Sequence, residues 1–231
     1  MRGVNTFDTF RAVIHDAMSA SQPPDAIIAT GDLVQDETRA GYEHFLEALA
    51  RYNLPVHCIP GNHDSPDIMN DVLGNPPFQV GGTVTLDNWS IILLSSFSRG
   101  DDGGRLSASE LERLRKTLAV NKSSHALICV HHHPVPMGSR WLDGVALRNS
   151  DEFFAVVEQS TQVRGILWGH VHQASDAMRD HVRLMSTPST CSQFLPNSDN
   201  FALDTRTPGY RWLELRQDGT IETTVVWLER L

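Results

Sequence analysis

The chain has 231 residues, with 19 Lys and Arg against 28 Asp and Glu, which gives a formal net charge of −9. This acidic balance argues against a nucleic-acid partner, which needs a basic surface. Three cysteines, Cys58, Cys129 and Cys191, are too few for a disulfide framework, so we expect a reducing compartment and buried roles for Cys58 and Cys129. No apolar run approaches the ~20 residues that span a bilayer, so we expect a cytoplasmic protein with no membrane partner.

Apolar residues recur at helical spacing in four segments. Three of them cover residues 7–14, 42–49 and 111–118, and the fourth starts at Ser150. Ser107 and Glu110 precede the third segment at the spacing of a capping box, in which each side chain accepts a backbone N–H of the other residue. We therefore expect four amphipathic helices that each pack one face against a core.

Short apolar runs alternate with these helices. They cover residues 26–29, 56–59, 91–94, 126–130 and 166–168. Continuous runs bounded by turn residues predict strands that are buried on both faces and covered by helices, as in α/β proteins. The tail differs, because residues 210–215 and 221–228 alternate in polarity around Asp218-Gly219, which predicts a hairpin.

Polar residues follow four of these runs. The stretches are Gly31-Asp32, Gly61-Asn62-His63-Asp64, His131-His132-His133-Pro134 and Gly169-His170-Val171-His172. Side chains at the carboxyl ends of core strands meet at one edge of an open α/β sheet, where ligands collect. Each stretch alone is compatible with an ordinary turn, and Asp64 with a helix cap. Together they place six of the eleven histidines in three loops, and Asp, Asn and His are ligands for hard-to-borderline metal ions.

The histidine pairs add two local expectations. Three consecutive histidines cannot all face one point, so at most one or two of residues 131–133 are expected to be ligands. His170 and His172 are two residues apart and would share one face of a strand, a geometry that suits metal binding and also an exposed strand.

The order Gly-Asp, Gly-Asn-His-Asp, His-His-Pro, Gly-His-x-His resembles that of the calcineurin-like metallophosphoesterases. Further segments make the chain similar to bacterial class III 3′,5′-cyclic-AMP phosphodiesterases, namely residues 3–6, 141–143, 147–149, 187–191, 200–201 and 203–205. The likeness covers essentially the whole chain. It implies a single domain over residues 1–231 with the family's αββα sandwich, an α/β fold of two mixed sheets flanked by helices.

The resemblance also implies a pair of divalent metal ions, iron or manganese. The metal ligands in this sequence would be Asp32, Asn62, His132, His170 and His172. Asp32 would bridge the two metals, and His172 would bind the second one. His132 is preferred over His131 and His133 because it is the first histidine of the His-His-Pro unit.

For catalysis, the resemblance implies hydrolysis of 3′,5′-cyclic AMP to 5′-AMP by attack of a metal-bridging hydroxide. His63 would donate a proton to the departing ribose oxygen, and Asp64 would orient His63. The residues in contact with the substrate or product phosphate would be Asp32, Asn62, His63, His132 and His172.

One piece of the family pattern is expected to be missing. The family opens with a strand that ends in Asp-x-His, and both residues bind the second metal, whereas this sequence starts with Met1-Arg2-Gly3 at the position just after that strand. A start assigned too far downstream and a real loss are both open. Two other functions therefore stay open: a metallophosphoesterase of other or broad phosphodiester specificity, and an inactive metal-binding remnant.

Overall fold

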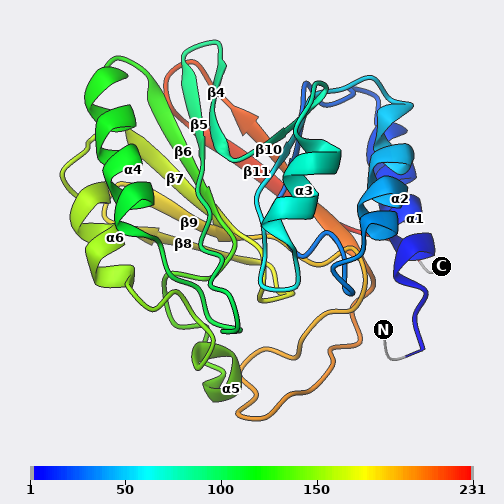
Figure 1. The fold of residues 1–231 in the computed structure, drawn as a ribbon. Coiled ribbons are helices and arrows are strands. Elements are labelled where there is room, and N and C mark those ends of the chain that lie inside the picture. Colours follow the sequence, from blue (N-terminus) through cyan, green and yellow to red (C-terminus); the bar gives the residue numbers. More distant parts are fainter. Residues whose placement is uncertain (1–2, 230–231) are drawn as a thin grey trace.

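The computed structural model describes residues 3–229, which form helical layers on either side of two layers of β-sheet (Figure 1). Helices α4 (Ala108–Val120) and α6 (Ser150–Val157) cover one outer face, and α1 (Thr6–Met18) and α2 (Arg39–Ala50) cover the other. The expected α/β fold of sheets flanked by helices is confirmed. The absence of a first strand and the single-domain organisation stay predictions.

The larger sheet has six strands in the order β4-β5-β6-β7-β9-β8. Their bounds are β4 Gly82–Leu86, β5 Trp89–Leu93, β6 His125–Val130, β7 Val163–Trp168, β8 Ser175–Arg179 and β9 Val182–Ser186. The central strands are parallel and both outer pairs are antiparallel, so this sheet is mixed. Along β6, Ile128 packs into the core under the helices, whereas Leu127 and Cys129 pack into the core between the sheets. Because both faces are covered, the strand is apolar from Ala126 to Val130.

The smaller sheet is parallel and has the order β1-β2-β3. Its strands are β1 (Ile27–Ala29), β2 (Val56–Cys58) and β3 (Phe78–Val80), with helix α3 (Pro66–Leu73) between β2 and β3. Residues of α1, α2 and α3 pack together with Val56 and Cys58 in a second core. Cys58 and Cys129 are free, buried thiols inside these cores, as expected.

The predicted hairpin is confirmed as β10 (Gly209–Leu215) and β11 (Ile221–Trp227). Its turn is fixed by the Asp218 carboxylate, which accepts the backbone N–H of Thr220 at 2.9 Å. Gly219 has a φ of 88°, a conformation that few residues with a Cβ adopt. Tyr210 of β10 donates its hydroxyl to the Asp16 carboxylate of α1 at 3.0 Å, which ties the hairpin to the helical layer.

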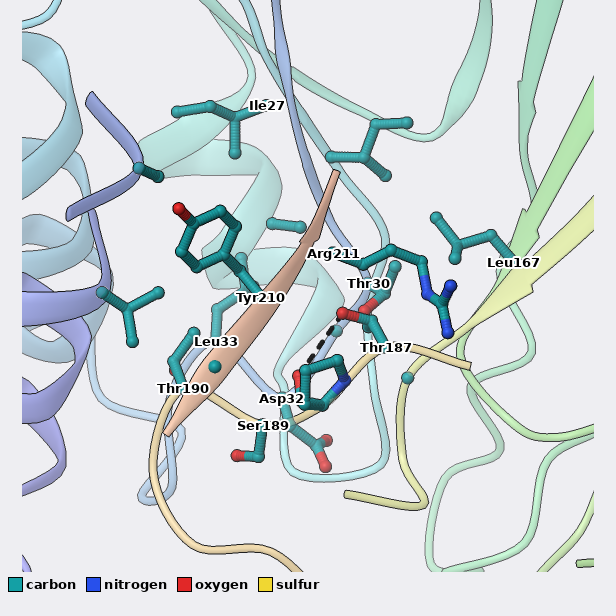
Figure 2. Close-up of a pocket in the computed structure, with 18 of the residues that line it drawn as sticks. Ile27, Thr30, Asp32, Leu33, Leu167, Thr187, Ser189, Thr190, Tyr210 and Arg211 are labelled. Atoms are coloured by element: carbon teal, nitrogen blue, oxygen red, sulfur yellow. Dashed lines mark hydrogen bonds between the residues drawn. The ribbon is translucent and has the colours of Figure 1, made fainter. Parts of the chain in front are cut away.

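A cavity of about 1600 Å³ separates β1 from β10, and we call its part between these two strands the β1–β10 groove (Figure 2). Among the strands of residues 3–229, β1 pairs only with β2, so it is an edge strand of its sheet there. The N–H of Ile27 donates to Pro55 and the carbonyl of Ala29 accepts from Ile59, both on the β2 side. Since alternate residues of a parallel strand point to opposite neighbours, Ile28 directs its N–H and carbonyl into the groove.

The four expected helices are confirmed, and one cap differs from expectation. Ser107 accepts the backbone N–H of Glu110 at 3.1 Å, which is half of a capping box. The Glu110 carboxylate instead accepts the backbone N–H of Ser95 and pairs with Arg113. The N-terminal end of α4 is therefore bound to the loop that follows β5, and it does not form a complete capping box. Within residues 3–229, no helix is both long enough and apolar enough to cross a membrane.

Candidate metal centre and substrate cavity

The four polar loops converge because β1, β2, β6 and β7 end at the same edge of the two sheets. The loops that carry Asp32, Asn62 and His131 lie in very close contact. A Cβ atom on Gly61 would collide with the Asp32 carboxylate and with Cε1 of His131, and one on Gly31 would collide with Nδ1 of His131. Glycine is therefore required at both positions by the contact between loops, and at Gly31 also by a φ of 99°.

The innermost ligand candidates are Asp32, Asn62, His131 and His170. Oδ1 of Asn62 lies 3.0 Å from Nδ1 of His170 and 3.2 Å from Nε2 of His131. That same Nε2 lies 3.4 Å from Oδ2 of Asp32. A carboxylate oxygen, an amide oxygen and two imidazole nitrogens thus face one point, a donor set that suits a divalent transition metal. Nε2 of His170 is buried and makes no hydrogen bond among the described residues.

His131, rather than His132, directs a ring nitrogen toward Asp32 and Asn62. The carbonyl of Thr30 fixes the His131 ring through Nδ1 at 2.7 Å, which leaves Nε2 for the ligand cluster. In His132, Nδ1 lies 2.7 Å from Oγ of Ser96 and Nε2 lies 3.1 Å from the carbonyl oxygen of Asp102. A ring nitrogen of His132 still lies within 4.8 Å of those of His131 and His170, but both of its nitrogens have protein partners outside the ligand set.

His133 and His172 lie outside the innermost group of ligand candidates. His133 is buried, with Nε2 3.5 Å from the Asp143 carboxylate. His172 lines the cavity, and its Nδ1 lies 2.8 Å from the carbonyl oxygen of Ser192, which leaves Nε2 as its available ligand atom. A ligand histidine whose other ring nitrogen is hydrogen-bonded to a carbonyl is the usual arrangement in metal sites.

The expectation that His170 and His172 share a strand face is wrong. Strand β7 ends at Trp168, and both histidines lie in the loop that follows it, with φ of 62° and 46°. Asp32 has a φ of 55°. Left-handed backbone at residues with a Cβ is strained, and strain of this kind collects at functional sites. These three ligand candidates therefore occupy unfavourable backbone geometry that the surrounding loops maintain.

His63 lies at the cavity lining, where its backbone N–H donates to Oδ1 of Asp32 at 3.0 Å. Its Nδ1 accepts a hydrogen bond from the side-chain amide of Gln35 at 3.0 Å. An amide N–H donor at Nδ1 places the proton of a neutral imidazole on Nε2. Gln35 is a site residue that no sequence motif predicts, although it lies only three residues after Asp32 in the same loop.

Asp64 does not contact the His63 ring among the hydrogen bonds of the described residues. Its buried carboxylate accepts the backbone N–H of Gly61 at 2.8 Å, that of Leu33 at 3.1 Å and the hydroxyl of Tyr42 at 3.0 Å. These bonds join the Asp32 loop, the Asn62 loop and α2. Asp64 therefore holds two ligand loops together. The residue that contacts the His63 ring, the position expected for Asp64, is Gln35.

Burial and the ligand cluster set the charges here. Burial lowers the pKa of His170 far below its ordinary value and also lowers that of His172, so both imidazoles are neutral and able to bind a metal. Burial acts to raise the pKa of Asp32, but the neighbouring His131 overcomes this effect and brings it well below the usual range. Burial acts to lower the pKa of His131, but the charge and hydrogen bond of Asp32 together with the hydrogen bond of Thr30 raise it above its ordinary value. Burial raises the pKa of Asp64 to about 6.

The fold and the ligand loops define the class of protein. The family model for calcineurin-like phosphoesterase matches residues 3–174, and the chain belongs to this family. The family uses a dinuclear metal site, and the histidine cluster described above lies within the matched region.

Curated relatives match nearly the whole chain. The chain is 42% identical over 224 residues to the 3′,5′-cyclic adenosine monophosphate phosphodiesterase CpdA of Escherichia coli K12, with 96% of this chain and 82% of that protein covered. It is 36% identical to the CpdA of Pseudomonas aeruginosa over 223 residues, with 96% and 82% covered.

Solved structures support the fold. A dimetal phosphatase from Danio rerio superposes with a TM-score of 0.65 at 14% identity, covering 90% of this chain and 84% of that one. The GAP50 protein of Plasmodium superposes with a TM-score of 0.67 at 12% identity, covering 97% and 80%.

Proposed function

We propose that this protein is a metal-dependent phosphodiesterase that hydrolyses 3′,5′-cyclic AMP, a small-molecule substrate, to 5′-AMP. The observation that carries the proposal is the 42% identity to the E. coli cyclic-AMP phosphodiesterase over 96% of the chain. The site geometry supports the chemistry, because phosphate esters are hydrolysed by enzymes that pair clustered metal ligands with a proton donor.

The first metal would be held by Asp32, Asn62, His131 and His170. We propose His131 in place of His132, because Nε2 of His131 faces Asp32 and Asn62 while both ring nitrogens of His132 are hydrogen-bonded elsewhere. The proton that Asp32 favours on His131 would be displaced when a cation binds. The donor set suits iron or manganese, which remain the proposed metals.

For a second metal, Asp32 and His172 are the candidates among the described residues. A pair of divalent cations supplies, when bound, Lewis-acid charge for the phosphate oxygens and a water of lowered pKa. The groups of the chain itself position the ester. Asn62 and His172 would face the phosphate. A protonated His63 would deliver its Nε2 proton to the departing ribose oxygen, and the amide oxygen of Gln35 would then accept the Nδ1–H that holds the ring.

Substrate comparison tests the proposal. Manganese-reconstituted protein is expected to convert cyclic AMP to 5′-AMP with a higher kcat/KM than it shows for cyclic GMP or bis(p-nitrophenyl) phosphate. Turnover of the aryl diester with cyclic AMP untouched would favour the alternative of another phosphodiester specificity.

A metal-binding protein without catalysis is the other candidate, because Asp32 and His172 are the two ligand candidates for a second metal among the described residues. It predicts one metal or fewer per chain and no turnover of any of these esters. Metal analysis of the reconstituted protein, carried out beside the assays, separates it from the two enzyme hypotheses.

A further inference from the structure

Three aromatic side chains line the cavity beside His172. Trp141 comes from the short helix α5 (Arg140–Asp143), and Phe194 and Phe201 come from the loop at 187–208. The three ring centroids are 5.2, 5.2 and 5.3 Å apart, with interplanar angles of 71°, 70° and 69°. We call these three residues the aromatic wall. Edge-to-face contacts at these distances are favourable between aromatic rings, so the wall is one packed unit.

The aromatic wall is joined directly to the proposed metal centre. The ring of Phe194 stacks on that of His172 with centroids 4.1 Å apart and an interplanar angle of 3°. The backbone N–H of Phe194 also donates to the carbonyl of His172 at 3.1 Å. In a nucleotide, a single sugar separates the base from the phosphate. A phosphate beside His172 therefore places its base within reach of the next rings of the wall.

Polar contacts away from the cavity hold the wall in position. The backbone N–H of Ser198 donates to Oγ of Ser139 at 3.1 Å, and Arg140 pairs with Asp199 at 2.6 Å. These contacts join α5 to the 187–208 loop, and Figure 1 shows the two segments side by side. The rings are thus ordered before any ligand binds, which lowers the entropic cost of stacking.

Phe201 is the most exposed member of the wall, with 37% of its surface accessible, while Phe194 is buried. We propose that the aromatic wall binds the nucleobase of the substrate by stacking, with Phe201 as the contacting ring, and so selects purine nucleotides over phosphate esters that lack a base. This subsite rests on the proposed phosphodiesterase function. Aromatic side chains bind bases in this way because every base has a π-face.

Paired binding measurements test the subsite without turnover. Isothermal titration of manganese-loaded protein gives the Kd of 5′-AMP and of ribose 5-phosphate, and their ratio isolates the contribution of the base. We expect 5′-AMP to bind on the order of tenfold more tightly. Phe201→Ala is expected to bring the ratio close to one, while Phe201→Trp preserves it.

Leu195→Ala is the matched control, because Leu195 lies in the same loop with 42% exposure but does not line the cavity. It is expected to leave the ratio unchanged. Thermal unfolding of each variant shows whether the loop has lost its structure, and Phe201→Leu serves if the alanine variant is unfolded. The subsite is overturned if the ratio is unaffected at Phe201, or if 5′-AMP binds no better than ribose 5-phosphate to the unmodified protein.

The two proposals fail separately. A protein that does not hydrolyse cyclic AMP but shows a Phe201-dependent preference for 5′-AMP has the subsite without the proposed function. A protein that hydrolyses cyclic AMP, but whose preference for 5′-AMP over ribose 5-phosphate does not change in Phe201→Ala, has the function without this subsite.

Discussion

The side-chain amide of Gln35 donates to Nδ1 of His63 at 3.0 Å, so the loop that carries Asp32 also fixes the imidazole proposed as proton donor. Gln35→Leu removes this bond and frees the ring to rotate. We expect kcat for cyclic AMP to fall about 10- to 100-fold with little change in KM, since general acid catalysis contributes typically 10²–10⁴-fold.

Leaving-group dependence identifies the cause of this loss. Bis(p-nitrophenyl) phosphate releases a stable phenolate that needs no proton, so Gln35→Leu is expected to retain most of its activity toward it. Gln217→Leu, at an exposed position in the hairpin turn, is the control and should match the unmodified protein on both substrates. An equal loss on both substrates would show that Gln35 acts on the structure rather than on proton transfer.

His131 and His132 differ in what they contact, and their alanine variants should differ in metal content. His131→Ala removes the nitrogen that faces Asp32 and Asn62, so we expect manganese affinity to fall by about 100-fold or more. His132→Ala removes a ring bonded to Ser96, so its main effect should be a loss of about 1–3 kcal/mol in the free energy of unfolding. Metal titration combined with urea unfolding separates the two outcomes, and the reverse pattern would restore His132 as the ligand.

Asp64 is predicted to be a stability residue. Asp64→Ala leaves the N–H groups of Gly61 and Leu33 and the hydroxyl of Tyr42 without their acceptor. We expect the free energy of unfolding to fall by about 3 kcal/mol, because each buried unpaired donor costs about 1–3 kcal/mol and relaxation recovers part of this. Urea unfolding measures the change, with the exposed Asp25→Ala as control. A change below 1 kcal/mol would contradict the role assigned to Asp64.

Metal binding should stabilise the fold, because the ligands belong to four separate loops. Manganese at 100 times its Kd is expected to add about 2.7 kcal/mol, which corresponds to a rise in Tm of roughly 5–10 °C for a chain of this size. Calorimetry with manganese and with a chelator checks this, and His131→Ala should abolish most of the rise. A Tm that does not respond to manganese would count against the cluster as a metal site.

Hydrogen–deuterium exchange of backbone amides should show whether the side of β1 that faces the groove is unpaired. The amide of Ile28 points into the β1–β10 groove, whereas Ile128 lies on β6, which has a strand on either side. We expect the Ile28 amide to exchange with deuterium at least about 100 times faster, since exposed strand edges open locally at low free energy. Comparable protection at both residues would mean that the groove edge is covered in solution.

Local sequence predicts the elements whose pattern is complete. Helix α4 could be placed from its leucines and Ser107, because a cap and an apolar stripe are both local. Strand β8 could not be found in this way, since it lies at the edge of its sheet, where a largely exposed strand has no apolar run. The choice between His131 and His132 depends on where Thr30 and Ser96 lie, and both are distant along the chain.

The β1–β10 groove has a consequence for handling the protein. The N–H and carbonyl of Ile28, which face this groove, are a template for an extended segment of the same protein or of a second copy. Pairing of this edge with a second molecule would become more frequent as the protein concentration rises, so light scattering that grows with concentration is the expected sign of an uncovered β1 edge. High dilution, or a short strand-forming peptide that occupies the edge, would reduce such pairing between copies.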